Sequence, residues 1–225
     1  MTKLVFIFRP EPGNSASCAR ASALGMKPIS APLFCIEAVT WDAPDPKNYT
    51  AIMMTSANAA RFAGQHLARY KHLPLFAVGS ATEASARGAG FASVVAGEEN
   101  VVHLLATIAT LGPQKILHLC GEDRVGLPSI GLEIDQQVVY RSVPISQNLR
   151  ILSEASKPGI CLMHSPRAAA RFADLCNAQD IEKSQISIVA ISEAAARAAG
   201  PGWERVAIAA NPRDDDMLQI ASELA

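Results

Sequence analysis

Two serines stand at positions where a buried strand is expected to give way to a helix. Ser56 comes two residues after the apolar run 51–54, and Ser165 comes two residues after the apolar run 160–163. Serine is a favoured helix cap, because its hydroxyl accepts a hydrogen bond from an amide of the first turn. The remaining amides of such a turn carry partial positive charge and attract anions. The pattern therefore predicts two sites that can bind a carboxylate or a phosphate.

The same pattern occurs twice more, so the chain contains an internal repeat of it. Gly79 and Ser80 follow the run 75–78, and Ser192 follows the run 186–191. The carboxyl ends of parallel strands form the usual ligand-binding edge of an open α/β sheet. We therefore expect two related lobes, each with two helix starts at such an edge. If the lobes face each other, amides and hydroxyls, rather than Lys and Arg side chains, line the space between them.

Strand-like and helix-like segments alternate along the chain, which predicts parallel sheets covered by helices. Two extended stretches, 28–39 and 138–145, interrupt this alternation. We therefore predict an α/β fold of two parallel-sheet βα domains, flavodoxin-like, one inserted in the other and joined by a two-stranded β linker. The expected bounds are 1–33 with 146–225 for the first domain, 39–137 for the second, and 34–38 and 138–145 for the linker strands.

Local signals place the ends of several helices. Asn14 or Ser15 can cap a helix that Gly25 ends, because glycine readily adopts the conformation that follows a helix. Apolar residues at helical spacing predict a helix from about 57 to 67. A further helix is expected over 148–156.

Acidic and histidine residues have simple structural explanations in this sequence. Asp214, Asp215 and Asp216 fall in the first turn of the last expected helix, where carboxylates complement the helix dipole, and we favour this over metal binding. His118 and His164 lack the spacing of metal ligands. We expect His118 to be a strand residue without a role, whereas His164 precedes a helix start and can touch a ligand.

The composition is that of an ordinary soluble globular protein. The chain has 225 residues, 49% of them hydrophobic, and a formal net charge of -1, which argues against nucleic-acid binding through bulk charge. Its five cysteines include no C-x-x-C pair, so buried free thiols in a reducing compartment are expected. No apolar run approaches the length of a membrane span. We expect a cytoplasmic monomer that binds neither nucleic acid nor a membrane.

Four motifs in sequence order resemble the uroporphyrinogen-III synthase family. They lie at residues 55–59, 78–82, 139–144 and 165–168, and Arg9 follows the first strand as it does in that family. No single motif is specific, but their order and spacing together are. The resemblance covers essentially the whole chain, and it implies two α/β domains on a two-stranded linker.

The resemblance also implies an activity. The family cyclises the linear tetrapyrrole hydroxymethylbilane to uroporphyrinogen III, with inversion of ring D and loss of water, and it uses no metal or organic cofactor. Its linker tyrosine corresponds to Tyr140, which we expect to assist the leaving hydroxyl group. The substrate carries eight carboxylates. The residues expected to bind it are Arg9, Ser56, Ala57, Asn58, Gly79, Ser80, Thr82, Arg124, His164, Ser165, Arg167 and Ser192.

One segment departs from the family pattern. Where the family usually has Gly, Pro, Thr and Thr, this chain has Ser, Glu, Ala and Ala at 192–195, so the hydroxyl that would echo Thr82 is missing. This leaves a second hypothesis open, a non-catalytic two-lobe protein that binds an anionic small molecule. A dinucleotide-dependent enzyme is disfavoured, because no G-x-G-x-x-G follows any expected strand.

Overall fold

The computed structural model describes residues 3–97, 101–111, 115–124, 126–128, 131–145 and 159–225. The helix expected over 148–156 lies outside the described residues. Contacts divide the chain into two compact units. Unit 1 consists of Met1–Cys35 and Val143–Ala225, and unit 2 is Ile36–Ser142.

Unit 1 contains a five-stranded sheet whose strand pairs are all parallel in the described part of the chain. Its strand order is β11-β10-β9-β1-β2, so the chain first moves to one side of β1 and then continues on the other side. This is the flavodoxin-like order. The three inner strands β1, β9 and β10 are short, mostly apolar and buried runs, as expected for a parallel sheet covered on both faces. Their bounds are β1 Leu4–Ile7, β2 Lys27–Ser30, β9 Gly159–Met163, β10 Ile186–Ala190 and β11 Arg205–Ile208.

Strand β2 corrects one detail of the prediction, because the extended stretch 28–39 is not a single ribbon. Its first part pairs with β1 in the unit 1 sheet, with Pro28 beside Val5. Pro28 cannot donate a backbone hydrogen bond, and β2 is an edge strand, where this loss is tolerated. The rest of the stretch forms the separate strand β3, Phe34–Ala38.

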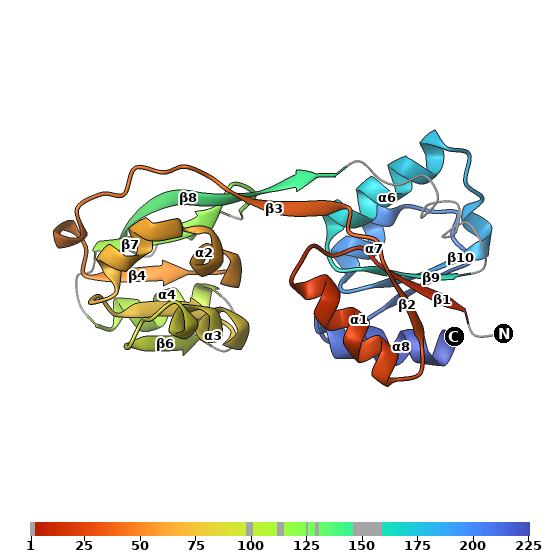
Figure 1. Cartoon of the computed structure of the whole chain (residues 1–225), viewed down its shortest axis with the longest axis horizontal. Helices are drawn as coiled ribbons and strands as arrows, with labels where there is room; N and C mark the ends of the chain where they lie inside the picture. Colours follow the sequence, from red (N-terminus) through yellow and green to blue (C-terminus); the bar gives the residue numbers. More distant parts are fainter. Residues whose placement is uncertain (1–2, 98–100, 112–114, 125, 129–130, 146–158) are drawn as a thin grey trace. The chain divides into compact units, whose positions relative to one another are not determined.

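Two layers of helices cover the unit 1 sheet (Figure 1). Helices α1 and α8 bury one face, and α6 and α7 bury the other. On the α6 face the ring of Phe172 lies between Phe8 and Trp203, with centroid distances of 4.5 and 5.6 Å. The helix bounds are α1 Gly13–Ala23, α6 Pro166–Ala178, α7 Glu193–Ala199 and α8 Asp214–Leu224, with a 3-10 turn at Lys183–Gln185.

Helix α1 ends as predicted but begins differently. Gly25 has a φ of 77° just beyond the helix, which glycine adopts without strain. The predicted caps Asn14 and Ser15 both lie inside the helix. The Asn14 side chain is buried and donates to the carbonyls of Ile7 and Arg9, so it ties the helix to the end of β1 instead of capping it.

Unit 2 contains a six-stranded sheet with the order β3-β8-β7-β4-β5-β6. The order reverses between β4 and β7, because β5 and β6 continue on one side of β4 and the later strands lie on the other. Strand β8 begins at residue 133, five residues before the extended stretch that the sequence predicted. The bounds are β4 Ala51–Met54, β5 Leu75–Val78, β6 Val94–Gly97, β7 Lys115–Gly121 and β8 Glu133–Pro144.

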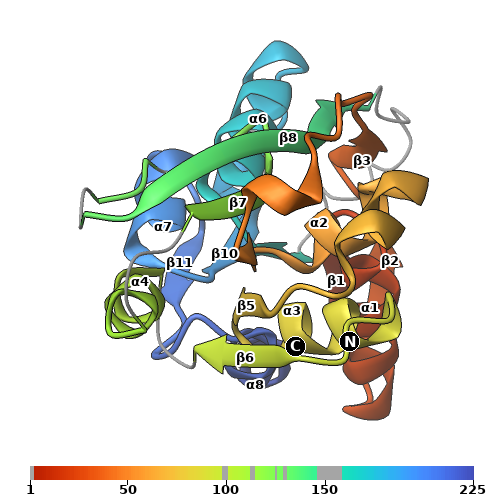
Figure 2. The ribbon, with the colours of Figure 1, turned by 90° about the vertical axis from the view of Figure 1, so that its left-hand side faces the viewer.

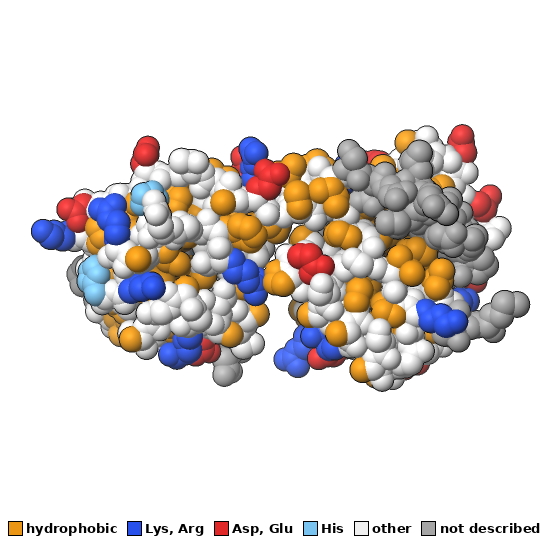
Figure 3. Space-filling view, in the orientation of Figure 1, with side chains coloured by type: hydrophobic (Ala, Val, Ile, Leu, Met, Phe, Trp, Pro, Cys, Tyr) orange, Lys and Arg blue, Asp and Glu red, His pale blue; other side chains and the backbone are white. Residues whose placement is uncertain are grey.

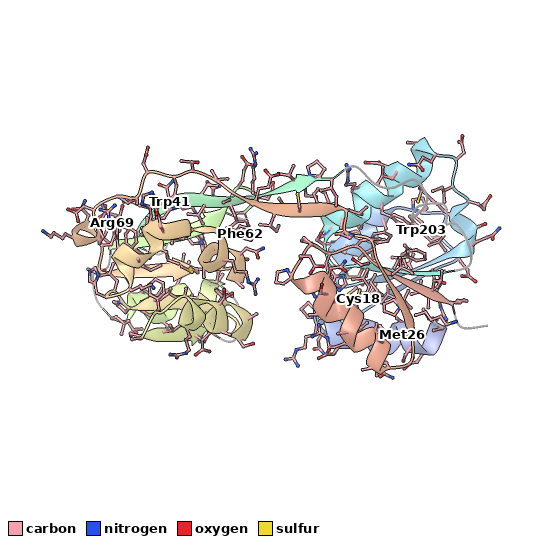
Figure 4. All side chains as sticks on the ribbon, in the orientation of Figure 1. Cys18, Met26, Trp41, Phe62, Arg69 and Trp203 are labelled. Carbon is pink, nitrogen blue, oxygen red and sulfur yellow. The ribbon has the colours of Figure 1, made fainter. Side chains whose placement is uncertain are left out.

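Helices cover both faces of the unit 2 sheet, with α2 and α3 on one face and α4 on the other (Figure 2). Trp41 lies in the core beside α2 and donates to the carbonyl of Ala63 at 2.9 Å (Figure 4). The bounds are α2 Ala57–Phe62, α3 Ser80–Gly88 and α4 Val101–Ala109, with 3-10 segments at Pro46–Asn48 and Gly64–Tyr70.

Helix α2 is shorter than predicted. The continuous helix expected to about residue 67 stops at Phe62, and the chain continues as a 3-10 helix from Gly64. Gly64 has a φ of 68°, which is outside the helical region and breaks the α-helix. Leu67 is buried as the apolar pattern predicted.

The visible surface of each unit carries Lys and Arg side chains as separate groups among neutral and hydrophobic atoms (Figure 3). Within the described ranges, no helix has the length and apolar character needed to cross a bilayer.

Candidate functional site

Each sheet reverses its strand order at one point, and ligands of open α/β sheets bind outside the carboxyl ends of the strands at such a point. In unit 1 the reversal lies between β1 and β9. Arg9 follows β1, and His164 and Ser165 follow β9. In unit 2 the reversal lies between β4 and β7, where Ser56 and Arg124 follow the strands. Most of the predicted binding residues therefore lie at the carboxyl edge of one sheet or the other.

Three serines cap helices in the predicted way. Ser56, Ser165 and Ser192 accept from backbone amides two or three residues ahead, at 3.3, 3.1 and 3.3 Å. Each hydroxyl satisfies one amide of its first turn and leaves others for solvent or a ligand. Helices α2 and α7 have only six and seven residues, so their dipoles are weaker than that of α6, with thirteen. Of these three starts, that of α6 is the better anion site.

The departure at 192–195 has a structural explanation. Ala195, the position of the missing hydroxyl, is fully buried in the core beneath α7. Thr82 occupies the matching place in α3 and is 4% exposed. Gly79 begins α3 with a φ of 78°, and Ser80 is the first helical residue. Because the third helical position faces inward in both helices, an alanine there fits the core of unit 1.

The unit 1 edge is built around the carboxylate of Asp214, the first residue of α8. Its Oδ1 accepts from His164 Nε2 at 2.5 Å and from Ser17 Oγ at 2.7 Å, and Arg9 Nη1 lies 3.4 Å away. Its Oδ2 accepts from Arg20 Nε at 3.1 Å. The Asp214 side chain is only 10% exposed. Asp214 lies in the first turn of α8, as the sequence predicted, and it is also the centre of a hydrogen-bond network.

The network fixes the charges of its members. Burial alone would raise the pKa of Asp214, but the hydrogen bonds from His164, Arg20 and Ser17 outweigh it and hold the pKa well below its usual value. Burial lowers the pKa of His164, whose side chain is 6% exposed, and outweighs the opposite effect of Asp214. At neutral pH the pair is thus a carboxylate that accepts a hydrogen bond from a neutral imidazole.

Arg9 is held against the start of α1. A Cβ atom at Gly13 would lie 2.6 Å from Arg9 Cζ, so the guanidinium occupies space that any side chain at position 13 would fill. Arg9 also donates to Ser17 Oγ at 3.2 Å. Arg9 also forms an ion pair with the carboxylate of Asp214, whose side chain is mostly buried.

Arg167 lies elsewhere on unit 1. Its guanidinium stacks over the ring of Phe34, 4.6 Å from the centroid. Both residues line a cavity of about 470 Å³ together with Arg171 and Asp174. Arg171 Nη2 donates to the carbonyl of Ile145 at 2.8 Å. The backbone of Arg167 belongs to the start of α6, whereas its side chain contributes to this groove.

The unit 2 edge contains a buried histidine, His118, for which no role was expected. His118 Nε2 lies 3.3 Å from Thr55 Oγ1, the hydroxyl just ahead of the Ser56 cap. Burial, with a smaller effect of the charge on Arg124, lowers the pKa of His118 to about 4. The imidazole is therefore neutral at pH 7, and it orients Thr55 through a hydrogen bond. His118 is a structural partner of the predicted site.

Arg124 follows β7 and is held by neutral oxygens. Its Nε donates to Gln136 Oε1 at 3.0 Å, and its Nη1 donates to the carbonyls of Gly121 and Glu122 at 3.4 and 3.2 Å. These bonds fix the guanidinium without cancelling its charge. Arg124 therefore offers a positive charge at the unit 2 edge.

Tyr140 lies on β8 beside the end of β7. Its carbonyl accepts from the amide of Glu122 at 2.9 Å. Its ring is half-buried against the core on the α2 face of the sheet and lies over Gly121. The register between β7 and β8 shifts between Cys120 and Gly121, so that Gly121 stands opposite Tyr140. The phenol is thus placed at the carboxyl edge, one strand from the reversal point of unit 2.

Comparison with known proteins shows the family to which the chain belongs. The family model for uroporphyrinogen-III synthase HemD matches residues 16–219. The chain belongs to the uroporphyrinogen-III synthase family. The fold is similar to that of uroporphyrinogen-III synthetase from Helicobacter pylori, with a TM-score of 0.70 and 18% identity over 100% of both chains. It is also similar to a mutant uroporphyrinogen III synthase from Thermus thermophilus, with a TM-score of 0.52 and 17% identity over 99% of this chain and 98% of that chain. No protein of curated function matches.

Membership in the uroporphyrinogen-III synthase family confirms the resemblance and the predicted α/β fold class. It places the protein among the enzymes of tetrapyrrole biosynthesis, which act on a small-molecule tetrapyrrole. Across the described ranges, no three His, Cys, Asp or Glu side chains gather closely enough to hold a metal ion.

Sequence reasoning missed several residues that organise these edges. Asp214 and Ser17 come together only through the fold, since they are 197 positions apart. His118, on β7, and Thr55, the residue after the neighbouring strand β4, are 63 positions apart. Gly121 gave a sequence signal, because a glycine at the end of a strand often marks a close approach of another group. That signal alone does not identify Tyr140 as the group.

Proposed function

We propose that the chain is a lyase that cyclises hydroxymethylbilane to uroporphyrinogen III, with inversion of ring D and loss of water. The observation that carries this proposal is the family match over residues 16–219. The arrangement of both sheet edges supports it, because the groups there suit a substrate with many carboxylates and one leaving hydroxyl.

The carboxylates of the substrate bind to groups at the edges of both units in this proposal. In unit 2, Arg124 supplies a charge that neutral acceptors hold in place, and the amides after Gly79 and Ser56 supply further donors. In unit 1, the start of α6 after Ser165 supplies amides, and Arg9 supplies a charge shared with Asp214. Hydrogen bonds to charged groups contribute about 1.5–3 kcal/mol each, so a few of them hold a polyacid.

Tyr140 assists the departure of the hydroxyl group. The carbon–oxygen bond breaks, the phenol donates its proton to the oxygen, and water leaves. The electron pair of the pyrrole nitrogen stabilises the remaining carbon as an azafulvenium cation. The proton released when the macrocycle closes then restores the phenol. A general acid placed in this way contributes roughly 10²–10⁴-fold to the rate.

Inversion of ring D requires one bond to break and two to form. The freed methylene carbon bonds to the ring D carbon that already carries the bridge from ring C, and that bridge bond then breaks. The bridge carbon bonds instead to the free α-carbon of ring D, which loses its proton, and the bound carboxylates hold the chain in the geometry that allows this sequence. Holding reacting groups in one geometry removes part of the entropic barrier. The same contacts exclude the simpler closure, which gives isomer I without an enzyme.

The test is to supply hydroxymethylbilane to the purified chain and to separate the uroporphyrinogen isomers. The proposal requires isomer III as the main product. Isomer I alone, at the spontaneous rate, would contradict it. Isomer I together with tight binding of uroporphyrinogen would favour the alternative, a two-lobe protein that binds an anionic small molecule. A monomeric state and a cytoplasmic location remain predictions.

A further inference from the structure

Gly121 touches Tyr140 more closely than any other residue type could. A Cβ atom built at position 121 would lie 2.6 Å from Tyr140 Cζ, 2.7 Å from Cε2 and 2.9 Å from the hydroxyl oxygen. Real Cβ atoms essentially never approach other heavy atoms within 3.0 Å. The Tyr140 ring therefore rests directly on the backbone of β7, in the space that a side chain at 121 would occupy.

The need for glycine at 121 comes from this contact and not from the backbone. The glycines with positive φ in the described ranges are Gly25, Gly64, Gly79, Gly90, Gly131, Gly200 and Gly202. Gly121 is not among them, so its backbone tolerates an alanine. The nearest obstacle to that alanine is the outer end of the Tyr140 ring, which can rotate away. An added methyl group would thus displace the phenol and leave β7 in place.

Hydrogen bonds also anchor the backbone beside the phenol. The amide of Glu122 donates to the Tyr140 carbonyl, which anchors the backbone of β8 to the end of β7. Arg124 donates to the carbonyl of Gly121 and to Gln136, which joins the same two strands. The two strands are thus joined on both sides of the ring, and the space over Gly121 decides where the hydroxyl lies.

We infer that Gly121 is a positioning residue for the reaction: by lacking a side chain, it lets the Tyr140 ring lie on β7 with its hydroxyl held at the carboxyl edge of the unit 2 sheet. This inference rests on the proposed role of Tyr140. Gly121 contributes no chemistry of its own, so its whole effect on the rate passes through the phenol.

The experiment is a double-mutant cycle of Gly121→Ala and Tyr140→Phe, with kcat and KM measured for hydroxymethylbilane. Gly121→Ala is expected to lower kcat about 10²-fold, as a displacement of about 1 Å at a reacting group does, with little change in KM. In the Tyr140→Phe background the same alanine is expected to cause no further loss. Gly126→Ala is the matched control, because a Cβ there meets nothing within 4 Å, and it should leave kcat unchanged.

Three results would overturn this inference and leave the proposed function intact. The first is a Gly121→Ala variant as active as the control, and the second is an equal loss of kcat when Gly121→Ala is added to Tyr140→Phe. The third is a Gly121→Ala variant with a raised KM and an unchanged kcat. A wild-type chain that makes only isomer I would overturn the proposed function first. If Gly121→Ala does not fold, folding of the double variant Gly121→Ala/Tyr140→Ala is measured instead. This double variant is expected to fold, because removing the ring makes room for the methyl group. A double variant that fails to fold while Tyr140→Ala alone folds would overturn the inference, because the methyl group at 121 would then be harmful without the ring.

Discussion

At the carboxyl edge of unit 1, polar side chains converge on the buried carboxylate of Asp214, whereas at the edge of unit 2 the polar groups bond to neutral partners. His164 and Arg9 both form hydrogen bonds with Asp214. Arg124 instead bonds to two carbonyls and a glutamine. The two sheets offer similar edges, but Arg9 at the unit 1 edge contacts the carboxylate of Asp214, whereas the hydrogen bonds of Arg124 at the unit 2 edge go to neutral oxygens.

The difference suggests that the two edges have different roles in the protein. A charge that is already paired gains little from a substrate carboxylate, because the new contact competes with the old one. The unit 1 network therefore contributes mainly to stability and to the shape of the edge. The unit 2 edge combines the charge of Arg124 with the phenol of Tyr140, and we expect it to dominate catalysis.

The largest effect is expected at the centre of the unit 1 network. Asp214→Asn leaves Arg9 and Arg20 without their shared carboxylate and should lower the free energy of unfolding by about 3 kcal/mol at pH 7. Chemical denaturation measures this. Asp215→Asn is the control, because Asp215 is 78% exposed and its ion pair is with Arg20. Its effect should stay within about 0.5 kcal/mol. Equal effects would show that the network is not cooperative.

The effect of Asp214 also depends on pH in a defined direction. Its folded pKa is depressed, so the carboxylate stabilises the protein above its unfolded pKa of about 3.8, and this contribution is lost as the pH falls below that value. The difference between wild type and Asp214→Asn should therefore shrink below about pH 4. A difference that stays constant down to about pH 2 would contradict the ionised state.

The next effect tests the chemistry of unit 2. Tyr140→Phe removes the phenolic proton and should lower kcat about 10²-fold, or about 2.7 kcal/mol, while binding of uroporphyrinogen III is little changed. Tyr49→Phe is the matched control in the same unit, since the Tyr49 hydroxyl bonds to Asp135 at 2.9 Å. An unchanged kcat for Tyr140→Phe would remove Tyr140 from the catalytic role.

His118 gives unit 2 a pH dependence of its own. The unfolded chain takes up a proton on this imidazole below about pH 6.5, whereas the folded chain does so only near pH 4. Stability therefore falls as the pH is lowered through this window, by about 2 kcal/mol at pH 5. His118→Leu should remove this part of the slope, measured by denaturation between about pH 7 and 4.5. The exposed His72 provides a control in His72→Gln, and equal slopes in both variants would contradict the account.

Local signals in the sequence predicted three serine-capped helix starts, although the predicted caps of α1 were wrong. Ser56, Ser165 and Ser192 each cap the helix that follows, because a cap depends only on the residues next to it. The strand alternation likewise predicted the α/β class. The length of α2 was overestimated, although Gly64 carries a recognisable stop signal.

Contacts between distant segments could not be predicted. The partners of Asp214 lie 50 to 205 positions away in the chain, and nothing in their own neighbourhoods indicates the pairing. The contact of Gly121 with Tyr140 depends on a register shift between β7 and β8, which no local pattern encodes. Such sites follow from the sheet order, and a single sequence does not determine that order.

The most direct test of the difference between the edges compares two arginines in one assay. Arg124→Gln and Arg9→Gln are made separately, and KM for hydroxymethylbilane is measured for each. Arg124→Gln is expected to raise KM about tenfold, which corresponds to about 1.4 kcal/mol, and Arg9→Gln is expected to raise it by less than about threefold. A larger rise for Arg9→Gln than for Arg124→Gln would contradict the account, because the arginine paired with Asp214 would then be the one that holds the substrate.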